Sequence, residues 1–235
     1  MKLKLYGAPL SPYVRKVRML LGKKGIAYDY DPRVSPLAMP EDYEKIHPLK
    51  RIPAMVIAHD GGETSIPDSS AICAFVEKAF PDTPFYPADP VDYAKALWLE
   101  EYGDTELGPN GTAAFFRTIF FSWATGSEPD MSAVEQGFEN IKRFAAYIDG
   151  ELGGNDWLIG DTMSIADISI AVHFVNISHA GYDLMESDGA ALHGLVERVC
   201  ADPVMAELIA GEGEAIASLG FEKPDLNAYR SEKGL

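Results

Sequence analysis

Hydrophobic and polar residues follow two different periods along the first 80 residues. Leu3 and Leu5 stand at alternate positions, which predicts a short strand. The apolar residues from Val14 to Leu21 then recur at three- and four-residue steps, which predicts a helix that Gly25 stops. Because Ser11 and Pro12 are typical of an N-cap and a first helical position, the chain is expected to begin as strand, turn and helix.

Strand patterns return after this helix, and a second helix follows them. Three further strands are predicted: one at residues 26–30, one at residues 54–58, and one that ends at Ile66 after a hairpin turn. Asp68 and Ser69 then open an amphipathic helix. The predicted order is therefore β-α-β, a connection, and β-β-α.

Strand signals disappear beyond residue 90. Apolar residues recur at helical spacing in four segments, which predicts a helical bundle: 91–107, 132–152, 164–179 and 190–218. Glycines and prolines in residues 108–132 predict a partly irregular connection. The polar tail, residues 222–235, is expected to lie on the surface or fray.

The boundary between these two halves is predicted at residues 81–90, PDTPFYPADP, because prolines at this density exclude a continuous helix. Charge changes at the same place. Residues 1–85 carry 12 basic and 10 acidic residues, whereas residues 86–235 carry 8 and 26, so the net charges are +2 and −18. The expected division is a first domain at 1–80, a linker at 81–90 and a second domain at 91–235.

Composition narrows the function. The chain has 235 residues, is 47% hydrophobic and carries a formal charge of −16, which suits a folded acidic protein. Binding to nucleic acid or to an anionic membrane is not expected, because both need a basic face. The two cysteines, Cys73 and Cys200, lack disulfide-scaffold or zinc spacing, so no metal is expected. With no signal sequence or long apolar run, we expect a cytoplasmic protein.

Four motifs occur in one order and at one spacing that resembles the glutathione S-transferase family: LSPYVRKVR, HPLKRIPAM, PDSSAIC and IGDTMSIADI. The resemblance covers nearly the whole chain and is nearest to the serine-type theta, zeta and tau group, in a bacterial-like form. It implies an α/β thioredoxin-like first domain that binds glutathione and an all-α second domain that holds the other substrate.

Ser11 is the candidate catalytic residue. A hydroxyl at a helix N-terminus lies beside unpaired N–H groups, where a thiolate is favoured over a thiol. By resemblance, Ser11 donates a hydrogen bond to the sulfur of glutathione and lowers its pKa. Two alternatives remain: Ser11 is only an N-cap, or Tyr6 at the end of the first strand activates the thiol. The residues SPYV replace the C-x-x-C of disulfide-exchanging relatives, so dithiol chemistry is not expected.

The resemblance also implies a set of glutathione-binding residues. Ile52 precedes Pro53, a cis-proline by resemblance, and its main chain is expected to pair with the cysteinyl part of glutathione. A trans proline at the start of an edge strand is the alternative. Asp68 and Ser69 are expected to hold the ammonium and carboxylate of the γ-glutamyl end, although such a pair is also an ordinary helix cap.

The segment HPLKRIP carries further candidates. Lys50 and His47 are expected near the glycyl carboxylate, although the commonest family form has Gly and Asn at these two places. Arg15 and Arg18 on the first helix fit a solvated face. The substrate pocket is expected in the aromatic stretch 113–123 together with part of the first helix, and the candidates are Leu10, Tyr13, Phe115 and Phe116. Most such aromatic stretches are simply core.

Ser164 and Asp167 form a capping-box pattern that resembles the family's structural motif in the second domain. We expect Asp167 to support folding and not ligand binding.

The predicted function is conjugation of glutathione to a soft electrophile, as in detoxification, by a homodimeric cytoplasmic transferase. Glutathione would be the co-substrate. The alternatives are a glutathione-dependent isomerase or dehalogenase on the same fold, and a non-catalytic glutathione-binding or adaptor protein.

Overall fold

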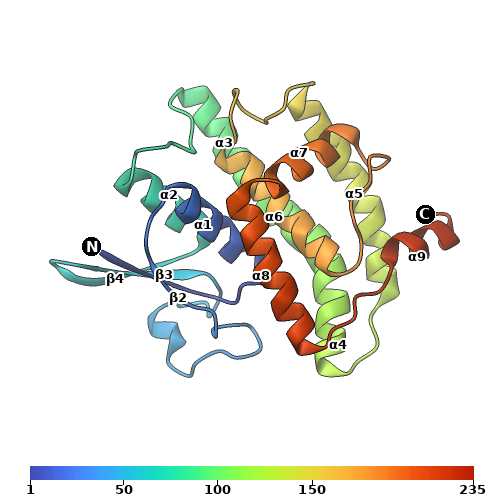
Figure 1. Cartoon of the computed structure of the whole chain (residues 1–235), viewed down its shortest axis with the longest axis horizontal. Coiled ribbons are helices and arrows are strands. Elements are labelled where there is room, and N and C mark those ends of the chain that lie inside the picture. The colour runs from blue at the N-terminus through green and yellow to red at the C-terminus, as the bar shows by residue number, and fades with distance from the viewer. The chain divides into compact units, whose positions relative to one another are not determined.

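A computed structural model describes residues 1–235, and the chain divides into two compact units, Met1–Phe85 and Tyr86–Leu235. Figure 1 colours the first unit from blue to green and the second from green to red. Each unit has its own core and is described by itself.

The first unit contains all of the strands. Its elements are β1 (Lys2–Tyr6), α1 (Pro12–Lys23), β2 (Asp29–Asp31), the short 3₁₀ helix η1 (Tyr43–Lys45), β3 (Ala54–His59), β4 (Gly62–Pro67) and α2 (Ser69–Ala79). The predicted element order is confirmed. The second strand was expected at residues 26–30 and begins three residues later, where it pairs with β1.

The sheet has the order β2-β1-β3-β4. β1 runs parallel to β2 and antiparallel to β3, with Tyr6 opposite Ala54, and β3 and β4 form the predicted hairpin. The parallel pair needs a crossover connection, which α1 provides. This small mixed sheet with α1 and α2, which pack together, is a thioredoxin-like domain.

The buried face of α1 holds more than its apolar residues. Val14, Val17 and Leu20 are almost completely buried, as their spacing predicts. Arg15, however, is 1% exposed, so its expected place on a solvated face is wrong. Arg18 is half-buried and lies 4.5 Å from the ring centroid of Tyr30. Helical periodicity places these cations on one side of the helix but does not show that this side is buried.

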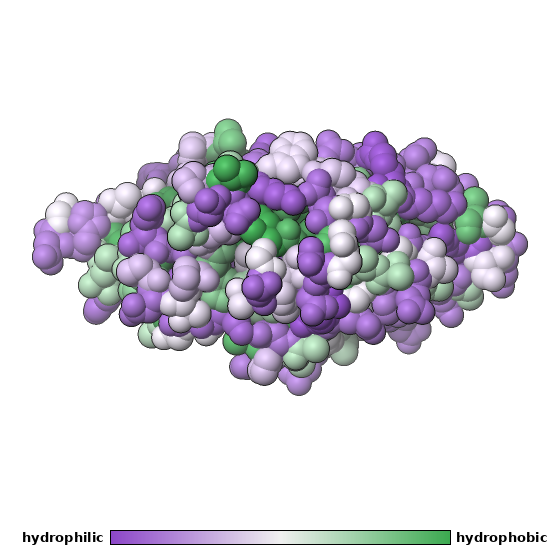
Figure 2. All heavy atoms as spheres, turned by 90° about the horizontal axis from the view of Figure 1, so that it is seen from above, coloured by the Kyte–Doolittle hydropathy of each residue, from purple (hydrophilic) through white to green (hydrophobic).

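The second unit is entirely helical. Its elements are α3 (Pro90–Tyr102), the π-helix η2 (Gly103–Phe121), α4 (Ser122–Thr125), α5 (Met131–Leu152), α6 (Ile165–His179), α7 (Ala190–Cys200), α8 (Pro203–Leu219) and α9 (Leu226–Lys233). No helix is both long and apolar enough to cross a membrane. On the face shown in Figure 2, hydrophilic residues predominate and hydrophobic residues form small separate patches.

α6 is the centre of this helical unit. It packs against α3, η2 and α7, and almost all of its residues are buried, so it lacks a polar face. Its start is fixed by Asp167, whose carboxylate accepts hydrogen bonds from the Ser164 N–H at 2.7 Å, the Ser164 hydroxyl at 2.8 Å and the Leu158 N–H at 2.8 Å. Burial raises the pKa of Asp167, against the effect of these hydrogen bonds.

Three expectations for the helical unit can be compared with the structure. The stretch 108–132 is irregular only in part, as expected: residues 126–130 form no helix, whereas the chain is helical up to Thr125, because η2 continues α3 without a break and accommodates Pro109. The run 190–218 is two helices, because Asp202 and Pro203 cap and open α8. The tail is not frayed: it forms α9, in which Leu226 is 1% and Arg230 8% exposed.

Candidate functional site

Ser11 is the N-cap of α1, as its position before Pro12 predicts. Its Oγ accepts a long hydrogen bond of 3.4 Å from the Val14 N–H, and its own O–H proton has no acceptor within the chain. The side chain is half-buried. The hydroxyl can therefore donate to a bound group at the positive end of the α1 dipole.

The bond between Ile52 and Pro53 is cis, as the resemblance implies and as periodicity alone could not show. Pro53 is buried directly before β3, and Ile52 packs against a small cluster of buried residues, namely Val34, Tyr43 and Ala54. The main chain of Ile52 thus lies two residues before the start of β3, an inner strand of the sheet.

Asp68 is the N-cap of α2 and has φ 83°, in the left-handed region that side chains other than glycine rarely adopt. Its Oδ1 accepts hydrogen bonds from the Ser70 N–H at 2.9 Å and the Ala71 N–H at 3.3 Å. These two N–H groups are therefore occupied by Asp68, which makes the expected anion site smaller than the cap pattern suggested. Oδ2 of Asp68 remains open to a cation, and Ser69 is 2% exposed.

Lys50 also has a left-handed backbone, with φ 49°. Its ammonium group lies 2.6 Å from the carboxylate of Glu44, and both side chains are about half exposed. Lys50 is one of three residues other than glycine with positive φ, and Asp68 is another. Such strained positions cluster at functional sites and cost on the order of 1–3 kcal/mol each, which supports a site at these two turns.

His47 is 5% exposed, and its Nδ1 accepts a hydrogen bond of 3.2 Å from the Leu49 N–H. Asparagine side chains make the same contact with the residue two positions ahead. This explains how histidine replaces the asparagine that is common in the family. Burial lowers the pKa of His47, the Arg51 guanidinium lowers it further, and the carboxylate of Asp68 opposes both.

Arg51 is a candidate that sequence reasoning missed. It is exposed, and its charge acts on His47 together with that of Asp68, so these three side chains share one region of the first unit. Lys50 takes the left-handed position at which the commonest family form has glycine. The sequence carried a signal for Arg51. If Lys50 stands at the turn position, the next residue, Arg51, is the basic residue directly before the Ile52-Pro53 pair.

Tyr6 lies on the sheet and not at the start of α1. Its ring meets Tyr43 edge-on at a centroid distance of 6.3 Å, and the Lys4 ammonium lies 4.8 Å from its centroid. Tyr6 packs against the buried cluster around Tyr43. The structure thus gives Tyr6 a packing contact, whereas Ser11 has an uncommitted donor.

Two family models together match most of the chain. The model of the glutathione S-transferase N-terminal domain matches residues 5–84, and the model of the C-terminal domain matches residues 112–203. The chain belongs to the glutathione S-transferase family. The four motifs in the sequence pointed to this family, and the thioredoxin-like and helical units are its two domains.

Individual relatives come from plants and bacteria. The chain is 28% identical over 211 residues to FtsZ-localized protein A of Caulobacter vibrioides, an alignment that covers 86% of this chain and 90% of that protein. It is 29% identical over 174 residues to glutathione S-transferase 3 of Zea mays, with 72% and 76% covered. A glutathione S-transferase structure from Rhodospirillum rubrum superimposes with a TM-score of 0.77 at 25% identity, with 88% and 91% covered.

The predicted pocket residues of this transferase-family chain differ in exposure. Leu10 and Tyr13 are half-buried around the start of α1. Phe115 is fully buried in η2, stacks on Tyr182 at 5.5 Å and meets Phe138 edge-on. Phe116 is 5% exposed and stacks on Phe120 at 4.8 Å. The structure therefore places Phe115 inside the helical core, between the rings of Tyr182 and Phe138, and not on a pocket wall.

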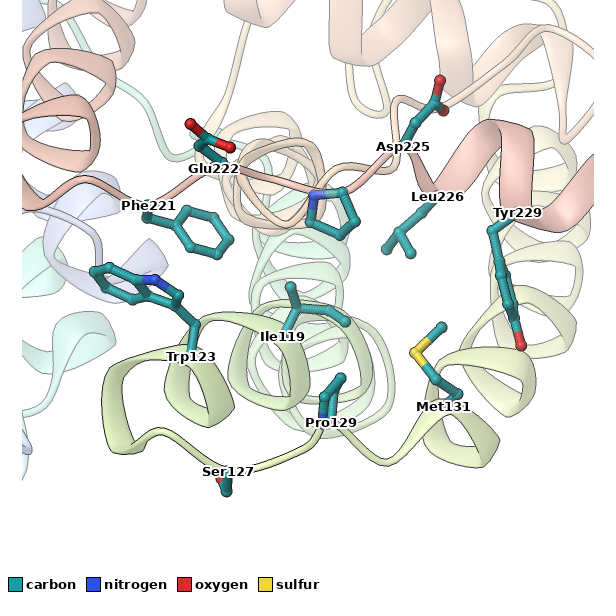
Figure 3. A pocket seen from close by; sticks show the side chains of 11 residues that line it. Ile119, Trp123, Ser127, Pro129, Met131, Phe221, Glu222, Asp225, Leu226 and Tyr229 are labelled. Atoms are coloured by element: carbon teal, nitrogen blue, oxygen red, sulfur yellow. The ribbon is translucent and has the colours of Figure 1, made fainter.

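The helical unit contains an open apolar cavity of about 410 Å³ (Figure 3). The end of η2, α4, the loop that follows it and the start of α5 line one side, and the segment that leads into α9 lines the other. The lining residues are Ile119, Trp123, Ser127, Pro129, Met131, Phe221, Glu222, Pro224, Asp225, Leu226 and Tyr229. Two of these, Ile119 and Trp123, belong to the aromatic stretch predicted to form a pocket.

The walls of this cavity are apolar and its rim is acidic. Trp123 and Phe221 meet at a centroid distance of 5.1 Å, and Met131 and Leu226 face the same space (Figure 3). The carboxylates of Glu222 and Asp225 point away from it. No group of three or more His, Cys, Asp or Glu side chains in the structure is arranged to hold a metal ion.

Proposed function

We propose that this chain is a cytoplasmic glutathione transferase that activates the thiol of glutathione with the hydroxyl of Ser11. The observation that carries the proposal is the uncommitted O–H of Ser11 at the start of α1, in the domain that the family uses for glutathione. Cis-Pro53 and the two strained turns at Lys50 and Asp68 support it.

Activation of the thiol needs little energy. The thiol loses its proton to water, and the Ser11 O–H donates to the sulfur anion, which the α1 dipole also favours. Lowering a thiol pKa of about 8.5 by one to two units requires roughly 1.4 to 2.8 kcal/mol. One hydrogen bond to a charged acceptor together with a helix dipole supplies about this amount, so no separate base is needed.

The remaining polar groups would hold the peptide. Oδ2 of Asp68 would accept from the γ-glutamyl ammonium, and Ser69 would donate to the neighbouring carboxylate. The main chain of Ile52 would pair with the cysteinyl part of glutathione in strand fashion. Lys50 and Arg51 would attract the glycyl carboxylate, since both carry exposed positive charge.

The cavity between η2 and the C-terminal segment supports a substrate class. Its volume of about 410 Å³ suits a small organic molecule, and its aromatic and aliphatic walls favour an apolar, preferably aromatic, electrophile. Glu222 and Asp225 on the rim disfavour an anionic compound. The attacking thiolate would form a bond to the electrophilic carbon, and the leaving group would depart with the displaced electron pair.

An ultraviolet difference titration at neutral pH tests the role of Ser11. Glutathione added to the wild-type protein should produce a thiolate band, and the band should vanish in Ser11→Ala while binding persists. Ser65→Ala, an exposed serine on β4 of the same domain, should keep the band. Binding without a band in the wild-type protein would contradict the proposal and would favour a glutathione-holding protein.

One observation favours a second function. A relative that aligns with 86% of the chain is named for its localisation to FtsZ, so this chain is a candidate for a partner-binding role with the same fold. The isomerase and dehalogenase alternatives use the same thiolate and share its test. Co-sedimentation with FtsZ polymers, together with glutathione binding but no turnover of any electrophile, would support the partner-binding role over the transferase.

We also infer a homodimer, which is typical of the family. Four apolar or aromatic residues of α3 are exposed: Val91, Tyr93, Leu97 and Trp98. The Trp98 indole N–H donates to the Tyr147 hydroxyl on α5 at 2.6 Å, so this face extends over two helices. Trp98→Asp should lower the sedimentation mass to that of one chain, whereas Leu219→Asp, exposed on α8, should leave it unchanged.

A further inference from the structure

The loop that carries Ser11 begins at Gly7, where β1 ends. Gly7 has φ 145°, in the region that favours glycine. A Cβ at this position would lie 2.5 Å from Cγ2 of Val14 and 3.2 Å from Cβ of Ile52. The main chain of Gly7 therefore lies against the first turn of α1 and against the residue before cis-Pro53. The proposed glutathione site uses both of these segments.

A tight turn joins Gly7 to Ser11. The Ser11 N–H donates to the Ala8 carbonyl at 3.2 Å, and the Arg15 N–H donates to the Ser11 carbonyl at 2.9 Å. The turn thus holds the main chain of Ser11 on one side, and the helix holds it on the other. The peptide group that joins Gly7 to Ala8 directly precedes this turn. Its orientation therefore sets the direction in which the turn leaves β1 and the place that the Ser11 hydroxyl takes.

Tyr30 on β2 holds this peptide group. Its hydroxyl donates to the Gly7 carbonyl at 2.8 Å, across 23 residues of the chain. The Gly7 N–H donates in turn to the Asp31 carbonyl at 3.1 Å. Both main-chain polar groups of Gly7 are therefore bound to β2, one through the main chain of the strand and one through the side chain of Tyr30.

The ring of Tyr30 is fixed as well. The Arg18 guanidinium lies 4.5 Å from its centroid, and the rings of Tyr30 and Tyr28 meet edge-on at 6.3 Å. Nε of Arg18 also donates to the Tyr28 hydroxyl at 3.3 Å. These contacts restrict the orientation of the Tyr30 ring. Because Arg18 belongs to α1, Tyr30 connects the start of the loop to the body of the helix that Ser11 caps.

We propose that Tyr30 is a positioning residue for the transferase reaction: its hydroxyl fixes the Gly7 peptide group and so directs the Ser11 O–H toward the sulfur of bound glutathione. This inference rests on the proposed role of Ser11 and adds a residue that acts only through it. A hydrogen bond depends on direction as well as distance. Loss of the anchor at Gly7 should therefore weaken the bond from Ser11 to the thiolate more than it weakens binding of the peptide.

The pKa of the bound thiol is the readout, measured from the thiolate absorbance as the pH is varied. Tyr30→Phe removes only the hydroxyl, and the pKa of bound glutathione should rise by about half a unit to one unit. The affinity for S-methylglutathione, which has no ionisable thiol, should stay close to that of the wild-type protein. Tyr28→Phe is the matched control: it removes a hydroxyl that accepts from Arg18, and the thiol pKa should not change.

A double variant shows whether Tyr30 acts through Ser11. In the Ser11→Ala background, Tyr30→Phe should shift the thiol pKa no further, because the hydrogen bond that it directs is already lost. An unchanged thiol pKa in Tyr30→Phe, even with a lower melting temperature, would overturn the inference. So would an equal shift with and without the Ser11 hydroxyl. Wild-type protein that binds glutathione without a thiolate band would instead overturn the proposed function, and this inference with it.

Discussion

Two groups of polar side chains, one in each unit, are anchored differently. In the thioredoxin-like unit, Ser11, Asp31, His47 and Asp68 hydrogen-bond to main-chain N–H groups only two or three residues ahead. On α9 of the helical unit the partners are remote: Arg230 reaches Asp188 and Tyr182, 42 and 48 residues away, and the Tyr229 hydroxyl donates to Glu135, 94 residues away. Substitutions in the first group should therefore act on a turn and its ligand, and those in the second on the fold of the helical unit.

The largest effect on stability is expected at Asp167, which forms a local capping box within the helical unit. Asp167→Ala removes a buried carboxylate and leaves the Leu158 and Ser164 N–H groups without acceptors. We expect a loss of about 4 kcal/mol and a fall in melting temperature of about 10 °C. Glutathione affinity measured below the transition should not change. Asp161→Ala, exposed in the preceding turn, is the control and should melt like the wild-type protein.

The ion pair between Arg230 and Asp188 should come next. Arg230→Ala leaves the carboxylate of Asp188, whose side chain is 0% exposed, without its cation, and we expect a loss of about 3 kcal/mol. Amide hydrogen exchange should rise first in α9, because Arg230 joins this helix to the rest of the unit. Lys233→Ala on the same helix is exposed and should leave exchange unchanged. Equal exchange in both variants would show that α9 does not depend on this pair.

Two glycines of α5 give opposite expectations. A Cβ on Gly137 would lie 2.6 Å from the ring of Phe115, whereas one on Gly150 would meet nothing within 4 Å. Gly137→Ala should cost about 2 kcal/mol through overpacking, and Gly150→Ala should stabilise the helix by about 0.5 to 1 kcal/mol. Urea unfolding measures both. Stabilisation by both substitutions would mean that the ring of Phe115 can move to accept the added methyl group. Packing between η2 and α5 would then be less rigid than we expect.

The smallest effect concerns Asp31 in the first unit. Arg33 donates to both of its carboxylate oxygens, at 2.8 and 2.7 Å, and lowers its pKa from 3.8 to about 2. A lowered pKa stabilises the fold above the unfolded value, and this contribution is lost as pH falls through about 2. Because Arg33 is exposed, Asp31→Asn should cost only about 1 kcal/mol at pH 7.

The pH dependence of that variant is the measurement. The difference in urea unfolding between Asp31→Asn and the wild-type protein should shrink between pH 4 and pH 2. Asp29→Asn, exposed on the same strand, serves as control. A difference that is independent of pH would indicate lost packing in place of lost charge.

The contrast also explains what the sequence could predict. Helix caps such as Ser11, Asp68 and Asp167 involve residues only a few positions apart, so their patterns can be recognised in the sequence. The family motifs added cis-Pro53, which no periodicity reveals. Asp68 also acts locally when it accepts hydrogen bonds from the Ser70 and Ala71 N–H groups. The sequence could not show that these N–H groups are unavailable to an anion, because this depends on the orientation of the Asp68 side chain.

Errors came from what neighbouring segments cover. Arg15 is polar and lies on a helix, so a solvated face was the reasonable expectation, yet it is 1% exposed. Phe115 is aromatic and near the expected pocket, yet Phe138 and Tyr182 enclose it. The tail is polar in sequence, yet one arginine meets a carboxylate 42 residues away. For Phe115 and Arg230 the deciding contact is remote in the chain.

The long π-helix η2 has a consequence for insertions and deletions. Its buried residues stand at every fourth position in two adjacent rows: Gly103, Leu107, Gly111, Phe115 and Ile119, and Gly108, Thr112, Phe116 and Phe120. In an α-helix of about 3.6 residues per turn, rows with this spacing drift around the axis. Deleting one residue near the start of η2 would shift every later position out of its row. Changes in chain length should thus be excluded from this helix and tolerated in the loop that follows Thr125.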